Sequence, residues 1–229
     1  RKESSAASDV YKRQALQAGG GAALLSWLPG LRAQPQSTAE RPGWPAWEAF
    51  KAQFINEGGR VISDDAGGGQ TYSEGQAYAL FFALVANDRT TFDKLLRWTE
   101  NNLCDGDMTA RLPAWLWGKR PDGTWGVIDS NAASDADLWI AYALGEAGRL
   151  WNVRTYRALS ALLAARILRE ETAQLPGLGL TLLPAPQGFA QKDGRWRLNP
   201  SYMPMHLMHW LAAEDPQPEW KQLVDSSLK

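Results

Sequence analysis

The sequence lacks several features on which common protein functions depend. It has one cysteine, Cys104, among 229 residues, so no internal disulfide can form, and no Cys/His cluster is spaced for structural zinc. Neither sign of charge is in excess, because 24 Lys and Arg residues stand against 25 Asp and Glu residues, for a net charge of −1. Without a basic field to attract a polyanion, we expect no nucleic-acid partner.

Several catalytic and metal-binding motifs are missing too. No Gly-x-Ser-x-Gly sequence marks a serine hydrolase, and the glycines of residues 67–69 are not followed by the Lys-Ser/Thr pair of a phosphate-binding loop. His206 and His209 can share a helix face, but no third ligand is indicated. The aspartates of residues 129–137 lack the glycine and the terminal glutamate of a calcium loop. We therefore expect no metal and no other cofactor.

What the sequence does contain is typical of a globular protein with many tryptophans. It is 45% hydrophobic and 21% charged and long enough to bury a full core. It has 12 Trp, twice the 6 Tyr. Most of them are expected in the core or between helices, where indole buries much area. A minority lining a groove would suit sugar rings, whose C–H faces stack on indole.

The amino-terminal residues predict export. Residues 1–14 have no apolar periodicity and no initiating Met, so we interpret them as a leader foreign to the fold. Residues 15–33 combine a preceding basic pair with an apolar, glycine-broken stretch, which predicts a secretory signal; a buried helix is the alternative. Residues 34–43 form a polar linker. The expected location is the periplasm or the outside of the cell, with no membrane span in the mature protein.

From Trp44 onward the apolar spacing predicts an all-α protein with almost no strands. Short connections alternate with long ones at about 104–134 and 173–200, which is typical of helix pairs that need neighbours, as in solenoids or closed toroids. The long connections are expected at one end, where loops commonly carry function. The predicted helices lie within residues 44–55, 73–87, 88–103, 129–151, 152–171, 201–214 and 218–229.

Acidic residues begin two of these helices. Glu74 follows a glycine-rich loop, and Asp135 and Asp137 open a helix otherwise built from Leu, Ile, Ala and Trp. One interpretation is structural: Ser73 caps one helix, Ser134 or Asp135 caps the other, and the acids complement the helix dipoles. The other is chemical, because two carboxyl groups across a cleft are what glycoside hydrolysis requires. The residues alone leave both interpretations open.

One stretch resembles a known enzyme signature. The sequence "ASDADLWIAYALGEAGRLW", residues 133–151, resembles the signature of glycoside hydrolase family eight, the family of cellulase D. The segments "YSEGQAY", "RLPAWLWGK", "DSNAASDAD" and "NPSYMP" extend the resemblance over residues 44–229, toward the periplasmic endoglucanases that accompany bacterial cellulose synthases. The resemblance implies an (α/α)6 barrel, here its first six to seven helices, with a long cleft across one end.

The resemblance also implies a reaction and site residues. It implies inverting endo-cleavage of β-1,4-glucan, with the cellulose synthase machinery as a partner. Glu74 matches the general acid, and Asp135 matches the signature's active-site aspartate. We expect Asp135 to bind and distort the sugar at the cleavage subsite, because inversion uses a water molecule and no enzyme nucleophile. Four further residues match motifs that line the family's cleft: Trp115, Trp117, Asn131 and Tyr202.

The resemblance places one catalytic group outside the sequence. The aspartate that activates the water is expected beyond Lys229, so we expect a carboxy-terminally truncated and inactive enzyme. The alternatives are a non-catalytic glucan-binding component, or a family relative that acts on chitosan, xylan or mixed-linkage glucan.

Overall fold

The structure, a computed structural model, describes residues 43–63, 68–191 and 193–228. The predicted leader, the signal segment and all of the linker but Gly43 lie outside these residues. The chain divides into two compact units, Arg1–Gln53 and Phe54–Lys229. In the described part of the first unit, helix α2 (Pro45–Phe54) stacks Trp47 on Phe50 with ring centroids 5.8 Å apart. The predicted domain start at residue 44 stays a prediction.

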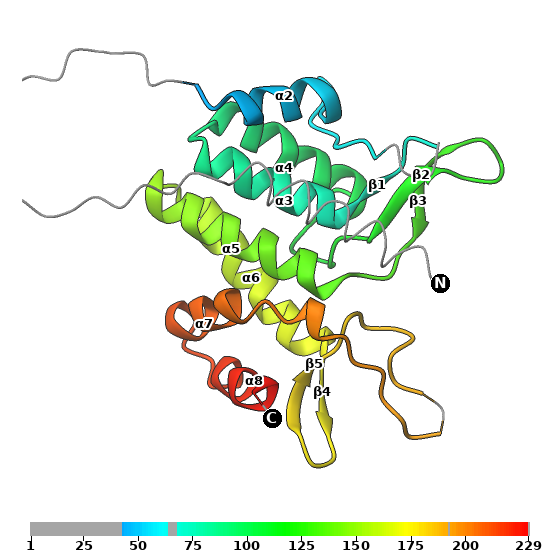
Figure 1. Ribbon diagram of the computed structural model, residues 1–229, viewed down its shortest axis with the longest axis vertical. Coiled ribbons are helices and arrows are strands. Elements are labelled where there is room, and N and C mark those ends of the chain that lie inside the picture. Colours follow the sequence, from blue (N-terminus) through cyan, green and yellow to red (C-terminus); the bar gives the residue numbers. More distant parts are fainter. Residues whose placement is uncertain (1–42, 64–67, 192, 229) are drawn as a thin grey trace, which may run out of the picture. The chain divides into compact units, whose positions relative to one another are not determined.

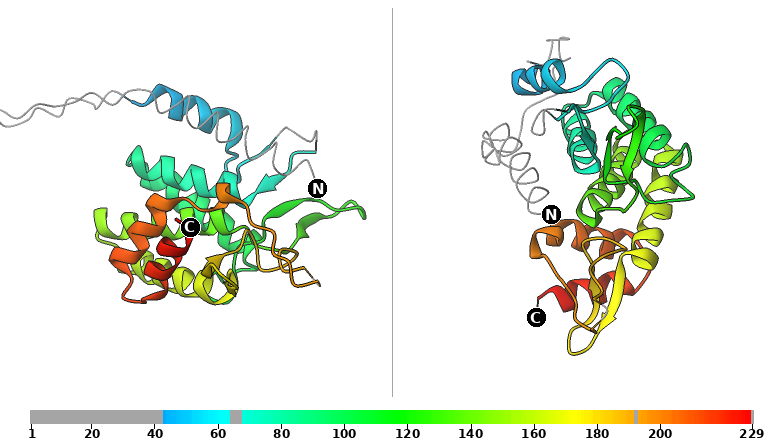
Figure 2. Two further views of the ribbon diagram at one scale, coloured as in Figure 1. Left: turned by 60° about the horizontal axis from the view of Figure 1, so that its bottom comes forward. Right: turned by 90° about the vertical axis from the view of Figure 1, so that its right-hand side faces the viewer.

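The second unit is built from helix pairs. Helices α3, α5 and α7 contact one another in succession, and α4, α6 and α8 each pack on the helix that precedes them. The three pairs follow one another along the unit in Figure 1 and in the right-hand view of Figure 2. This arrangement confirms the predicted paired-helix repeat. The bounds are α3 (Ser73–Val85), α4 (Arg89–Leu103), α5 (Ser134–Leu150), α6 (Arg154–Glu170), α7 (Met205–Glu214) and α8 (Glu219–Ser227).

Five short strands occupy the connections and one helix entrance, where the sequence predicted almost none. Strands β1, β2 and β3 form an antiparallel sheet in that order, and β4 and β5 form a hairpin. Strands of two to five residues show too little alternation to be predicted from the sequence. The strands are β1 (Thr71–Tyr72), β2 (Leu116–Lys119), β3 (Trp125–Asp129), β4 (Thr172–Leu175) and β5 (Gly179–Leu182).

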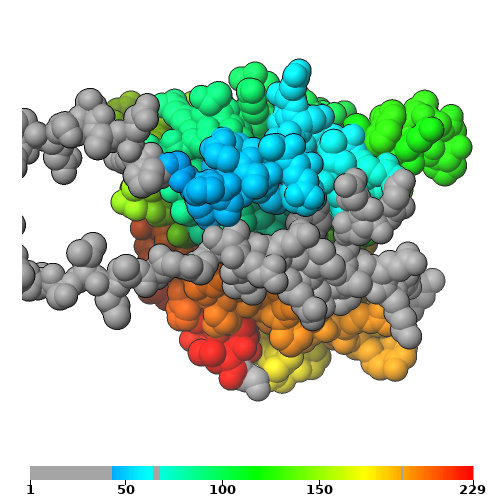
Figure 3. Space-filling view, turned by 45° about the horizontal axis from the view of Figure 1, so that its top comes forward, coloured from blue at the N-terminus to red at the C-terminus, as the bar shows by residue number. Residues whose placement is uncertain are grey.

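The β2–β3 turn is stabilised by its own side chains. Asp122 Oδ1 accepts hydrogen bonds from the Thr124 amide at 2.9 Å and from the Thr124 hydroxyl at 2.7 Å. Gly123 lies between them with φ of 84°, a conformation that favours glycine. The tip of this hairpin projects from the surface of the second unit (Figures 1 and 3).

The predicted serine caps of α3 and α5 are wrong. Each serine is the first helical residue, and the extended residue before it makes no side-chain cap. The Ser73 amide donates to the Trp115 carbonyl at 3.0 Å, and the Ser134 amide donates to the Pro184 carbonyl at 3.1 Å. Both serine hydroxyls are buried without a hydrogen-bond partner in the described residues. Main-chain bonds from the connecting segments therefore fix these two helix starts.

Small residues allow helix α5 to lie close to its neighbours. A methyl group added at Gly145 would overlap the ring of Trp210 and lie 2.9 Å from the Ser160 Oγ. The Ser160 hydroxyl donates to the Ala141 carbonyl at 2.7 Å, so it already occupies the space beside α5.

None of the helices in the described ranges combines the length and the apolar character needed to cross a membrane.

Candidate active site

Three predicted site residues act on one tyrosine hydroxyl, one by a hydrogen bond and two by their charge. Glu74 is in the first turn of α3, Asp135 is in the first turn of α5, and Tyr202 ends the 3-10 turn η1 (Pro200–Tyr202). Tyr78 donates from its hydroxyl to Glu74 Oε1 at 3.1 Å. Burial raises the pKa of Tyr78 far above its usual range, and the nearby Glu74, Asp135 and Tyr202 raise it further. Tyr78 therefore stays protonated and serves Glu74 as a donor.

The turn that carries Tyr202 departs from the predicted helix over residues 201–214. Helix α7 begins only at Met205. The physical reason is Pro204, which has no amide to donate and which disfavours helical geometry in the residue before it. Tyr202 is therefore held in a separate turn, where the Asn199 side chain accepts from the Ser201 amide at 3.1 Å.

Asp135 is nearly enclosed by the protein. It is 4% exposed, and its Oδ1 accepts from the Ala136 amide at 2.9 Å. The N-cap of α5 is Ala133, so the interpretation of Asp135 as the cap is wrong. A carboxylate at this position interacts favourably with the α5 dipole.

Aromatic rings surround the convergence of the helix starts. Trp139 lies edge-on to Tyr78, with ring centroids 5.6 Å apart, and 5.3 Å from His206. Trp115 stacks on Tyr72 at 5.8 Å, directly before α3. Across the described ranges, no three His, Cys, Asp or Glu side chains are grouped to hold a metal.

The other two predicted residues line a separate hollow. A cavity of about 740 Å³ contains Trp117 and Asn131 in its wall, whereas Glu74, Asp135 and Tyr202 are not part of that wall. The six predicted residues therefore fall in two places. Besides Trp117 and Asn131, the wall includes Arg111, Arg120, Trp125 and Gln187.

In the cavity wall, Trp117 belongs to a stacked aromatic pair. Its ring lies 5.4 Å from that of Trp125, with an interplanar angle of 25°. The Arg60 guanidinium carbon lies 4.4 Å from the centre of Trp117 and 4.9 Å from that of Trp125. Stacking with a cation over the ring stabilises this platform. Trp125 is still 49% exposed, which leaves part of the platform open to a ligand.

Asn131 connects the two long connections. Its Nδ2 donates to the Gln187 carbonyl at 3.0 Å, and its Oδ1 accepts from the Gln187 amide at 3.2 Å. The Asn131 carbonyl also accepts from the Trp115 amide at 2.8 Å. Asn131 therefore positions the two loops, and its predicted place in the lining of a cleft stays a prediction.

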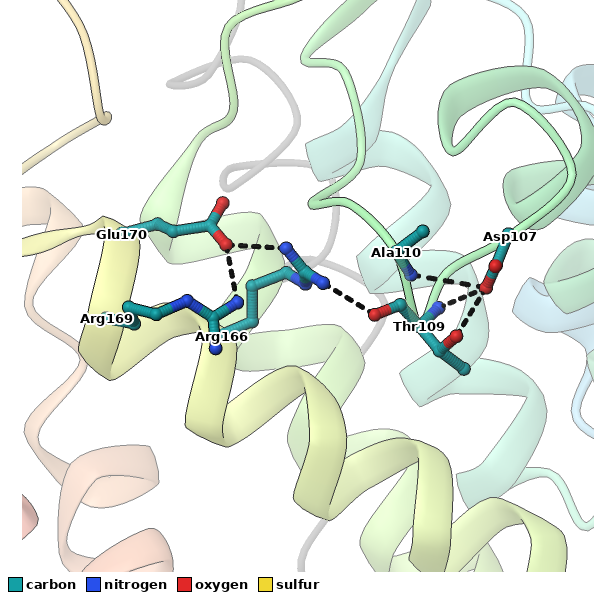
Figure 4. Close-up of polar contacts among 6 residues, drawn as sticks. All are labelled: Asp107, Thr109, Ala110, Arg166, Arg169 and Glu170. Atoms are coloured by element: carbon teal, nitrogen blue, oxygen red, sulfur yellow. Dashed lines mark hydrogen bonds and ion pairs between the residues drawn. The ribbon is translucent and has the colours of Figure 1, made fainter.

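The loop that carries Arg111 is tied to the end of α6 (Figure 4). Arg166 donates to the Thr109 carbonyl and to Glu170, both at 2.6 Å. Asp107 Oδ1 accepts from the Thr109 amide at 2.8 Å and from the Ala110 amide at 3.2 Å. Ala110 and Glu170 belong to the cavity wall, so these bonds help to set its shape.

Sequence reasoning missed two residues next to Glu74. Tyr78 lies four residues after Glu74, which places both on one face of α3, and this spacing was a usable signal. Gln76 is fully buried and accepts from the Val61 amide at 2.6 Å, while its Nε2 donates to Thr99 Oγ1 at 2.9 Å. Gln76 thus fixes the segment that carries Arg60, a role that depends on contacts distant in sequence.

Known proteins are similar to this chain in sequence. An endoglucanase of Pseudomonas fluorescens (strain SBW25) is 47% identical over 191 residues, which are 83% of this chain and 48% of that protein. An endoglucanase of Escherichia coli (strain K12) is 52% identical over 167 residues, 73% of this chain and 45% of that protein. The chain therefore spans about half the length of these relatives.

Solved structures share the fold. The endo-1,4-D-glucanase of Vibrio fischeri ES114 superposes with a TM-score of 0.78 and 53% identity, over 80% of this chain and 53% of that one. The family 8 endoglucanase Cel10 of Klebsiella pneumoniae has a TM-score of 0.72 and 33% identity, over 80% of this chain and 57% of that one. These similarities confirm the predicted fold class, an all-α partial toroid.

The family model described as "Glycosyl hydrolases family 8" matches residues 28–229, which confirms the resemblance carried by residues 133–151. The match takes in both acidic helix starts and both long connections. By sequence and by fold, this chain belongs to glycosyl hydrolase family 8.

Proposed function

We propose that this chain forms the substrate-binding and proton-donating part of an endo-β-1,4-glucanase that hydrolyses its polymer with inversion. The observation that carries the proposal is that two separate helix starts bring carboxyl groups near one tyrosine: Glu74 accepts a hydrogen bond from the Tyr78 hydroxyl, and the charge of Asp135 acts on the same hydroxyl. Glycoside hydrolysis needs two carboxyl groups at the scissile bond. Relatives at 47% and 52% identity carry the name endoglucanase, which supports a glucan as the substrate, and the name of the Vibrio fischeri endo-1,4-D-glucanase supports the 1,4 linkage.

In this proposal, Glu74 gives its proton to the oxygen of the leaving sugar. The C–O bond breaks with its electron pair moving to that oxygen, while a water molecule attacks the opposite face of the sugar ring. The hydrogen bond from Tyr78 holds the Glu74 carboxyl in one orientation. Positioning of this kind lowers the activation free energy because the acid is already oriented toward the glycosidic oxygen before the reaction.

Asp135 has the second role. Its carboxylate, in the first turn of α5, accepts hydrogen bonds from the sugar hydroxyls at the cleavage subsite and stabilises the positive charge that develops on the ring. Tyr202 and Trp115 contribute ring contacts at the same subsites. The water-activating base is proposed to be an aspartate outside residues 1–229.

Export and assembly belong to the same proposal. We propose a periplasmic or secreted location, with cellulose as the polymer and cellulose synthase machinery as the partner. Support comes from the basic and apolar pattern of residues 12–33. A fusion of residues 1–43 to a periplasm-dependent reporter checks the location, because a reporter that stays in the cytoplasm contradicts it.

The test of the catalytic proposal separates binding from cleavage. Calorimetry with cello-oligosaccharides measures binding by the chain, and release of reducing ends from carboxymethylcellulose measures hydrolysis, with this chain and with a longer form extended past Lys229. Glu74→Gln in the hydrolytic form should lower the rate about 10²–10⁴-fold, because the proton donor is lost. Binding should persist, because Gln is nearly the same shape as Glu.

The control is Glu57→Gln, the same chemical change at an exposed residue, which should leave the rate unchanged. An unchanged rate in Glu74→Gln would overturn the acid assignment. Binding without hydrolysis in every form supports the alternative of a glucan-binding component. A panel of chitosan, xylan and mixed-linkage glucan tests the other alternative.

A further inference from the structure

Two carboxyl groups that the proposed chemistry does not use lie buried behind Asp135. Asp137 is in the first turn of α5, and Glu171 directly follows α6. Both residues are 0% exposed. Their carboxyl groups are near enough for each to act directly on the other.

No other group satisfies these carboxyl oxygens. All four are buried, and no hydroxyl, amide or cation of the described residues donates to any of them. Two carboxylates have no proton to place between them, since ionised carboxyl groups only accept hydrogen bonds. A contact between them therefore requires that one of the two be protonated.

The electrostatic surroundings point the same way. The other titratable groups that act on the pair are Asp135 and Glu170, which are also acidic. The buried Cys104 is a further neighbour, since the charge of Asp137 helps to raise the pKa of its thiol. The nearby cations, Arg166 and Arg169, pair with Glu170. Two adjacent negative charges without a counter-ion in the interior would be strongly destabilising.

We propose that Asp137 and Glu171 share one proton in a carboxyl–carboxylate hydrogen bond that fastens the start of α5 to the end of α6, and that this bond positions Asp135. The sharing of the proton is independent of the proposed function. The positioning of Asp135 for glucan binding rests on the proposed function.

Main-chain hydrogen bonds link the surroundings of the pair to the helix start that carries Asp135. The Glu171 carbonyl accepts from the Leu183 amide at 2.7 Å, and the Ser134 amide donates to the Pro184 carbonyl at 3.1 Å. The same two-residue segment therefore anchors the end of α6 and the start of α5. The pair adds a side-chain link between these two points.

The geometry of α5 separates its two buried aspartates. Residues two apart on an α-helix project about 200° apart, so Asp135 and Asp137 leave α5 on opposite sides. With Asp137 fastened to Glu171, the first turn of α5 is held against rotation, and the Asp135 carboxyl keeps its position. Asp137 and Glu171 are thus positioning residues.

Burial, followed by the neighbouring carboxyl groups, raises the pKa of both Asp137 and Glu171. The sign follows directly. A folded-state pKa above the unfolded value means that the folded chain binds more protons, so this contribution is complete below the unfolded pKa and is lost as the pH rises toward the folded pKa.

Infrared spectroscopy of the chain tests the shared proton. The wild type should keep a protonated-carboxyl band at neutral pH, and this band should be missing in Glu171→Gln and in Asp137→Asn/Glu171→Gln. Glu57→Gln, an exposed residue, is the matched control and should keep the band. A wild-type spectrum at pH 7 that matches the double variant would overturn the proposal.

Unfolding measured against pH gives a second, independent readout. Above about pH 5, the wild-type unfolding constant should rise up to tenfold per pH unit relative to the double variant, because one extra proton is bound in the folded state. The double variant replaces the shared proton by amide hydrogen bonds, so its unfolding constant should depend less on pH. If it does not fold, Asp137→Asn alone serves, since its amide can donate to Glu171. Equal slopes contradict the proposal.

Binding of cello-oligosaccharides measured against pH tests the positioning role. Wild-type affinity should fall over the interval in which the infrared band disappears, and the double variant should bind with an affinity that stays constant over that interval. Identical pH profiles would remove the positioning role. No wild-type binding at any pH contradicts the proposed function, while the spectra and unfolding constants still decide the proton.

Discussion

At the scale of single residues, the candidate site depends on which side chains meet Glu74. Its neighbour Tyr78 donates a hydrogen bond to it and packs edge-on against Trp139. Burial and the nearby acidic groups keep the Tyr78 hydroxyl protonated. The carboxyl group of Glu74 therefore has a fixed donor on one oxygen, which an acid in free solution lacks.

Tyr78→Phe tests this contact, because the ring stays and the hydroxyl is lost. A hydrogen bond to a charged group contributes about 1.5–3 kcal/mol, so the hydrolytic rate should fall about ten- to hundredfold. Rate measurements on carboxymethylcellulose check this, with cello-oligosaccharide affinity expected to stay nearly constant. Tyr142→Phe, a half-buried tyrosine one helix away, is the control. A rate equal to that of wild type would show that Tyr78 does not position the acid.

At the scale of elements, helices α3 and α5 begin in the same way. Each has an extended N-cap, then a buried serine held by a carbonyl from a connecting segment, then the acidic residue of the site. The helices themselves were predictable, since residues such as Phe92, Leu95 and Leu103 repeat at helical spacing and are buried. The starts were not, because their hydrogen bonds come from residues about 40 to 50 positions away.

Gly145→Ala tests the close approach of α5 to its neighbours. Alanine gains about 1 kcal/mol of helix propensity, but overpacking costs about 1–3 kcal/mol. Overpacking should prevail, because Trp210 is held in place by its hydrogen bond to Glu146 at 2.9 Å. We expect a net loss of about 1–2 kcal/mol in the free energy of unfolding, measured by urea titration. Gly58→Ala, at an exposed turn, should change it by under about 0.5 kcal/mol.

At the scale of the whole second unit, the two long connections are joined to each other. Asn131 binds the Gln187 main chain through two hydrogen bonds, so the loops that follow α4 and α6 act together. The same loops carry the cavity with the Trp117 and Trp125 platform. The same loops therefore position both the helix starts and the cavity wall.

Asn131→Ala should loosen this joint. The Gln187 amide loses its acceptor, and its hydrogen exchange, followed by NMR, should become faster by about two- to tenfold, since the lost bond contributes about 0.5–1.5 kcal/mol. Asn101→Ala, at the end of α4 and exposed, is the control and should leave that exchange rate unchanged. Unchanged protection of Gln187 in Asn131→Ala would mean that the loops are held by other contacts.

By itself, the sequence determined the helices, the pairing of helices through alternating connections, and the family, because periodicity and a contiguous signature are local properties of a chain. Only the tertiary structure decided which carboxyl groups meet. Glu74 and Asp135 lie 61 positions apart in the sequence, and Asp137 and Glu171 lie 34 apart. Helix packing brings these elements together, and a pattern local to one helix does not record which residues of another helix its side chains will approach.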